Sequence, residues 1–73
     1  MKNLLQRLTP EVKTKLDLLN EQYPFTAQNL IKQLEANDNV FDINFLTMSL
    51  MQKFLSVKLD DFYYIFEHDV ERG

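Results

Sequence analysis

Apolar residues recur at helical spacing in the first half of the chain. From position 10 onward they step by four or three residues, at Val12, Leu16, Leu19 and Tyr23. This spacing places them on one face of a helix. Thr9 and Pro10 provide a hydroxyl N-cap and a proline at the first helical position, and Pro24 disfavours helical geometry at the residue before it. The pattern therefore predicts a helix over residues 10–22.

The same reasoning predicts a second helix close behind the first. Thr26 is its expected N-cap, and Phe25 and Leu30 occupy the positions of a hydrophobic staple across that cap. The expected buried stripe is Ala27, Leu30, Ile31 and Leu34. Asn37 begins a polar breaker that ends the helix near residue 36. Ahead of both helices, a short helical lead-in is expected at Leu4, Leu5 and Leu8.

Two more helices are expected in the second half of the chain. Asp42 is the expected cap of a helix over 43–55, and Ser56 or a neighbour is the expected cap of a helix over 58–70. The third helix carries one apolar stripe at Ile43, Leu46, Leu50 and Phe54, and a second, rotated stripe at Phe41, Phe45, Met48 and Leu55. The expected core stripe of the fourth helix is Leu59, Phe62, Phe66 and Val70.

These elements predict a single all-α domain over residues 1–73, a small compact bundle of about four helices. Gly occurs once and Pro twice, which is too little turn chemistry for a sandwich or barrel of many strands. The expected core is Leu16, Leu19, Leu30, Leu34, Leu46, Leu50, Phe54, Phe62 and Phe66.

The stretch 40–66 contains more apolar residues than a one-sided helix needs. Roughly two-thirds of its positions are apolar, against three or four per two turns of an amphipathic helix. Either the third helix is covered on both sides by its own domain, or a second face packs against another subunit or protein. A domain this small buries only about 60% of its unfolded surface, which favours the second alternative. The expected interaction face is Phe41, Phe45, Met48, Met51, Tyr63 and Tyr64.

Charge is distributed unevenly along the chain. Of the 73 residues, 8 are Lys or Arg and 11 are Asp or Glu, which gives a net charge of −3. Residues 1–33 carry +2 and residues 34–73 carry −5. This polarity suits head-to-tail or antiparallel pairing, or a basic partner for the acidic end, although solvated faces without a partner would give the same pattern. An acidic chain is a poor general nucleic-acid binder, because phosphate affinity comes from accumulated Lys and Arg.

A helix-turn-helix DNA-binding domain is the alternative interpretation. The helix over 10–22, the turn 23–25 and the helix from Thr26 have about the spacing of that motif. The expected DNA-contacting residues are Thr26, Gln28, Asn29, Lys32 and Gln33. The segment 54–62 also resembles the end of Cro/CI-type repressor domains, where a short helix, a small polar turn and an acidic-apolar helix follow one another. Upstream, the Gln-led scaffold helix and small-residue turn of those domains are not found, so no family is assigned.

The sequence contains no motif that supports catalysis or cofactor binding. With no Cys, thiolate metal sites, disulfides and cysteine catalysis are excluded. His68 lies between Glu67 and Asp69, and adjacent helical residues point about 100° apart, so these three would not converge on one metal ion. Asp60 and Asp61 do not share a helical face for the same reason, and no Gly-rich phosphate loop is present. We expect no enzyme activity, no cofactor and no metal.

Taken together, the sequence predicts a non-catalytic protein–protein interaction module with a regulatory, adaptor or assembly role. It is expected to associate with a second copy through its apolar-aromatic helix face. No apolar run approaches the ~18 residues of a membrane span, and no signal-peptide pattern opens the chain. We therefore expect a cytoplasmic protein without a membrane partner.

Overall fold

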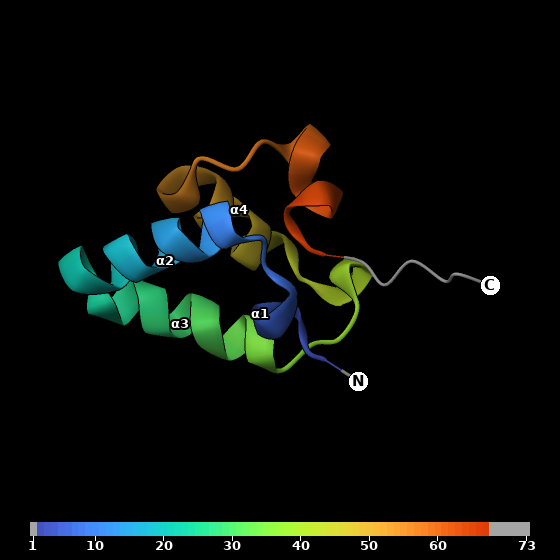
Figure 1. Ribbon diagram of the computed structural model, residues 1–73, viewed down its shortest axis with the longest axis horizontal. Helices are drawn as coiled ribbons and strands as arrows, with labels where there is room; N and C mark the ends of the chain where they lie inside the picture. The colour runs from blue at the N-terminus through green and yellow to red at the C-terminus, as the bar shows by residue number, and fades with distance from the viewer. Residues whose placement is uncertain (1, 68–73) are drawn as a thin grey trace.

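Prolines set the limits of the two longest helices in the computed structural model, which describes residues 2–67. Helix α2 (Pro10–Gln22) begins at Pro10, as predicted, although Thr9 forms no side-chain cap. Helix α3 (Pro24–Glu35) begins at Pro24, two residues earlier than predicted, so Thr26 is not its N-cap. The physical reason is that a proline suits the first helical position, where no N–H is needed. Tyr23 alone joins the helices, which run antiparallel along one another (Figure 1).

The predicted lead-in is confirmed as a short helix, α1 (Leu4–Arg7), with a complete capping box. The Asn3 side chain accepts a hydrogen bond from the Gln6 backbone N–H, and the Gln6 side chain accepts one from the Asn3 N–H, both at 3.0 Å. The Leu4 N–H donates to the Asn37 carbonyl at 2.9 Å. This bond ties the beginning of the chain to the end of α3.

The predicted third helix is divided into two elements. A 3₁₀ turn, η1 (Val40–Asp42), is capped by Asn39, and α4 (Phe45–Leu55) begins after the extended residue Ile43. The α4 cap is Asn44, whose side-chain oxygen accepts from the Thr47 N–H at 2.8 Å, so the prediction that Asp42 is the cap was wrong. Two nearby asparagines each satisfy an orphan N–H, and each therefore starts its own element.

The predicted fourth helix is a 3₁₀ helix, η2 (Leu59–Ile65), capped without a side-chain bond at Lys58. Ser56 is instead the left-handed C-cap of α4, with φ 56° and ψ 38°. Phe66 is extended and forms an antiparallel bridge with Leu8. The Thr9 N–H donates to the Ile65 carbonyl at 2.9 Å and the Glu67 N–H to the Arg7 carbonyl at 2.6 Å. These long-range bonds hold the backbone extended where the sequence predicted helix, and Val70 lies outside the described residues.

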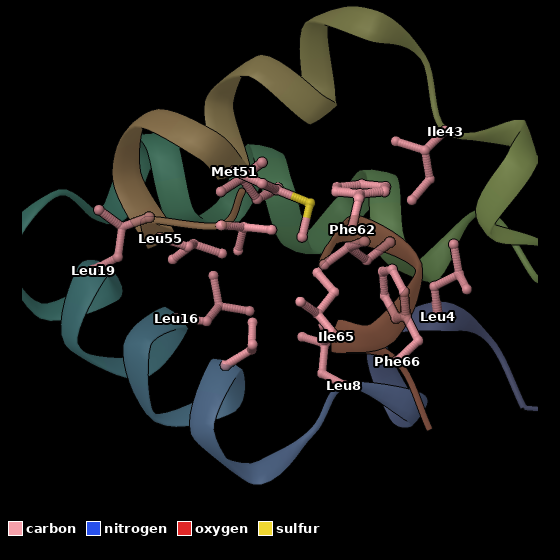
Figure 2. Close-up of a cluster of buried hydrophobic side chains, with 14 of the residues drawn as sticks. Leu4, Leu8, Leu16, Leu19, Ile43, Met51, Leu55, Phe62, Ile65 and Phe66 are labelled. Atoms are coloured by element: carbon pink, nitrogen blue, oxygen red, sulfur yellow. The ribbon is translucent and has the colours of Figure 1, made fainter. Parts of the chain in front are cut away.

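The all-α bundle of the described residues encloses one apolar core, to which all the α-helices and η2 contribute (Figure 2). Its members are Leu4, Leu8, Val12, Leu16, Leu19, Ala27, Leu30, Leu34, Ile43, Met51, Leu55, Val57, Phe62, Ile65 and Phe66. Two predicted core residues, Leu46 and Leu59, are exposed, and Leu50 and Phe54 are half-buried. In α4 the buried face is Thr47, Met51 and Leu55, which is about 100° around the helix from the predicted stripe.

Candidate interaction surfaces

Exposed aromatic side chains occur in η1, in the first turn of α4 and in η2. Phe41 is 80% exposed, Phe45 76% and Tyr64 72%. The rings of Phe41 and Tyr63 lie 6.1 Å apart between centroids, and those of Tyr63 and Tyr64 are edge-to-face at 5.5 Å. We call the following exposed residues the aromatic face: Phe41, Phe45, Leu46, Tyr63 and Tyr64.

The aromatic face contains four of the six predicted interaction residues and excludes the two methionines, Met48 and Met51. Met51 is fully buried, and Figure 2 shows its side chain pointing into the core beside Phe62. Assigning Met51 to the interaction face was therefore wrong, because it lies on the α4 face that meets the core. Met48 is half-buried and packs against the core. Leu46 belongs to the face instead, because α4 is rotated relative to the predicted stripe.

Hollows beside the aromatic face are lined partly by acidic residues. Asp38 lines one of them together with Phe41 and Tyr63, and Arg7 lines the same hollow. Tyr64 and Asp61 line a second hollow between α2 and η2, along with charges of both signs. Asp42 in η1 and Asp60 in η2 are exposed. The two hollows together are lined by three acids, Glu11, Asp38 and Asp61, and by three bases, Arg7, Lys15 and Lys58.

A second apolar surface lies where α2 and α3 meet, at the other end of the molecule from η1 and η2 (Figure 1). Phe25 is 90% exposed, Tyr23 56% and Leu18 54%. The Tyr23 ring lies 6.2 Å from that of Phe54 at the end of α4. We call these residues the hairpin-end surface: Leu18, Tyr23, Phe25 and Phe54.

Sequence reasoning missed the hairpin-end surface for an identifiable reason. Phe25 was predicted to staple onto Leu30 across a cap at Thr26. Because α3 begins at Pro24, Phe25 is in its first turn and points outward while Leu30 is fully buried. The exposure of Leu18 could have been predicted, because Leu18 falls outside the helical stripe formed by Val12, Leu16 and Leu19.

The predicted DNA-contacting residues lie on α3. Gln28, Asn29 and Lys32 are exposed, while Thr26 and Gln33 are half-buried. All except Gln33 line one shallow depression, which they share with Phe25. The Gln28 amide donates to the Asn20 side chain across the hairpin at 3.2 Å. A helix-turn-helix joins its helices by about three or four residues at a steep angle, whereas Tyr23 alone joins the antiparallel α2 and α3.

Among residues 2–67, no group of three or more His, Cys, Asp or Glu side chains is placed to hold a metal ion. His68 and Asp69 lie outside the described residues. Over the same part of the chain, no helix is long and apolar enough to cross a membrane. No family model, curated protein or solved structure matches this chain.

Proposed function

We propose that this protein is a non-catalytic interaction module of the cytoplasm, with a regulatory, adaptor or assembly role, that associates with a second copy through its aromatic face. The observation that carries the proposal is the run of contacting rings from Phe41 through Tyr63 to Tyr64, together with the exposed ring of Phe45 in α4. Aromatic side chains are enriched in interface cores. Contiguous apolar patches on soluble monomers are usually small, and larger ones mark interaction sites.

The exposed side chains of the aromatic face are of the kind that anchors an interface. An aromatic side chain contributes about 150–250 Å² when buried, and a standard interface buries about 800 Å² on each partner. The exposed parts of the four rings and of Leu46 supply a share of one such area. Because small domains are marginally stable, a partner that binds only the folded state also stabilises the fold.

The test is the oligomeric state over a concentration series, measured by sedimentation equilibrium. We expect the wild type to associate and both Tyr64→Ala and Phe45→Ala to weaken association at least tenfold with helicity retained. Gln52→Ala is the matched control, because Gln52 is an exposed residue of α4 outside the aromatic face. A wild type that stays monomeric at about 1 mM, where even weak association registers, would contradict the proposed self-association.

DNA binding by α3 is the second candidate. The observation in its favour is that Thr26, Gln28, Asn29 and Lys32 line one surface depression. Binding to a labelled random-sequence duplex at about 50 mM salt, followed by a salt titration, tests this function. A DNA-binding protein would lose affinity on Asn29→Ala or Lys32→Ala and be unaffected by Tyr64→Ala. The antiparallel hairpin supports the interaction module over this alternative.

A further inference from the structure

Residues 57–67, which we call the strap, follow α4 and supply part of the core. Their buried side chains are Val57, Phe62, Ile65 and Phe66, which are between 2% and 9% exposed. The strap contains η2, whose N-cap makes no side-chain bond, and 3₁₀ helices have poorer hydrogen-bond geometry than α-helices. The place of the strap in the fold therefore depends on its contacts with the other elements.

The strap is joined to the rest of the molecule mainly by apolar contacts and by bonds near its far end. Phe66 forms the bridge with Leu8, and two backbone hydrogen bonds join the strap to Arg7 and Thr9. Figure 2 shows the buried side chains of η2 in the same cluster as Met51 of α4. These partners all precede the strap in the chain, so the strap covers an apolar surface that the earlier elements provide.

The earlier elements, residues 2–55, are also linked to one another, and we call them the framework. Tyr23 joins α2 to α3, which lie along one another (Figure 1). The hydrogen bond from the Leu4 N–H to the Asn37 carbonyl ties α1 to the end of α3. The Asn44 side chain caps α4. None of these links involves the strap, so they remain when the strap leaves its place.

The connection between framework and strap is short and strained. Only residues 56–58 separate the end of α4 at Leu55 from the start of η2 at Leu59. Within this hinge Ser56 has φ 56° and ψ 38°, a left-handed conformation that is unfavourable for a residue with a Cβ. A short hinge under strain favours exchange of the element that follows it between two copies.

We propose that two copies exchange their straps, so that the strap of each covers the framework of the other. This mode of self-association is separate from the proposed docking of aromatic faces. The structure itself identifies the occupant, because an identical strap already fills the surface. Exchange replaces each contact within a chain by the same contact between chains. What it adds is the release of two strained hinges, and the ring contact of Phe41 with Tyr63 then joins two copies.

A pair of introduced thiols reports which framework each strap covers. The chain has no Cys, and the Glu67 N–H donates to the Arg7 carbonyl at 2.6 Å. This bond keeps the two Cα atoms within the roughly 4.4–6.8 Å that a disulfide spans. Neither side chain belongs to the core. The variant Arg7→Cys with Glu67→Cys is refolded from urea at about 10 µM or about 1 mM, oxidised, and run on a denaturing gel without reductant.

The gel separates the closed and exchanged forms. A closed copy forms the disulfide within one chain and runs as a monomer, whereas exchanged copies form it between chains and run as a covalent dimer. We expect the covalent dimer to be at least tenfold more abundant after refolding at the higher concentration. The single variants Arg7→Cys and Glu67→Cys are the controls and give the background of linkage between unpaired thiols.

The exchanged fraction should follow the strain at the hinge. Ser56→Gly relieves the strain and should lower the fraction of covalent dimer at least tenfold, because each dimer contains two hinges. Ser56→Val should raise it, since a β-branched residue is least compatible with a positive φ. Gln52→Gly and Gln52→Val, at an exposed position within α4, are the matched controls and should leave it unchanged. Sedimentation of the same variants without Cys measures the dimer independently of the disulfide.

Tyr64→Ala distinguishes strap exchange from docking of aromatic faces, because Tyr64 is 72% exposed and adds little to the buried side of the strap. Covalent dimers that persist in Tyr64→Ala support exchange. If Tyr64→Ala abolishes association and every disulfide lies within one chain, docking stands and exchange is overturned. Equal dimer fractions in Ser56→Gly and Ser56→Val also overturn exchange. If every variant is monomeric at the higher concentration, both proposals fail.

Discussion

The α2–α3 hairpin and the segment from η1 to η2 place their apolar residues differently. In the hairpin, two long helices each bury one stripe and leave a few apolar side chains exposed near their junction. The later segment is built from two 3₁₀ elements on either side of the 11-residue helix α4. Six of its large apolar side chains are exposed: Phe41, Phe45, Leu46, Leu59, Tyr63 and Tyr64.

The difference follows from how each region satisfies its backbone. Long helices make their hydrogen bonds internally, so their apolar residues are sorted by helical period alone. Short 3₁₀ elements satisfy fewer groups and depend on caps and on bonds to distant segments. In the later segment those bonds come from Arg7 and Thr9, so the orientation of its side chains depends on the N-terminal part of the chain.

The largest expected effect comes from removing the side chain that joins the end of the η1–η2 segment to the N-terminal part of the chain. Phe66 is 2% exposed, packs edge-to-face on Phe62 with centroids 6.0 Å apart, and bridges to Leu8. Phe66→Ala should lower the free energy of unfolding by about 3–5 kcal/mol, measured by urea denaturation at low protein concentration. Under the same conditions Tyr64→Ala should change it by less than about 1 kcal/mol. Equal losses in the free energy of unfolding would contradict the difference in burial between Phe66 and Tyr64.

The next largest effect distinguishes the buried and exposed sides of α4. Met51 is fully buried, whereas Met48 is half-buried. Met51→Ala should cost about 2–5 kcal/mol in the free energy of unfolding, with Met48→Ala costing clearly less. Thermal and urea unfolding of the two variants give the comparison. A larger loss at Met48 would mean that α4 is rotated back toward its predicted orientation.

A smaller effect tests where α4 begins. Asn44→Ala removes the side chain that accepts from the Thr47 N–H and should lower the free energy of unfolding by about 0.5–2 kcal/mol. Asp42→Ala is the control, because Asp42 ends η1 and does not cap α4. Both are measured by urea denaturation, and a larger loss at Asp42 would support a continuous helix from residue 43.

The smallest expected effect is a gain in stability at the end of α4. Ser56 has φ 56°, a left-handed conformation that disfavours residues with a Cβ. Ser56→Gly should raise the free energy of unfolding by up to about 1 kcal/mol, seen as a higher melting temperature. Gln52→Gly, within α4, is a control for which the opposite change is expected: it should lower the free energy of unfolding by about 1 kcal/mol. Destabilisation by Ser56→Gly would contradict the left-handed cap.

The candidate surfaces were predictable to different degrees. An excess of apolar residues between 40 and 66 indicated an interaction face, and Phe41, Phe45, Tyr63 and Tyr64 are exposed there. The excess did not reveal which α4 positions face outward, because apolar residues occur on every side of that helix. The prediction therefore placed Leu46 in the core, although Leu46 is exposed and its neighbour Thr47 is buried.

By itself, the sequence determined the all-α class, the lead-in helix, the extent of α2 and most of the buried stripes of the hairpin, with Tyr23 exposed and Ile31 half-buried as the exceptions. These features depend on local periodicity, caps and prolines, whose effects extend only a few residues. The tertiary structure alone decided that Phe66 is extended, that η2 is a 3₁₀ helix, and that Phe25 and Leu46 are exposed while Met51 is buried. The physical reason is that these outcomes depend on long-range backbone pairing and on which face of each helix the core accepts.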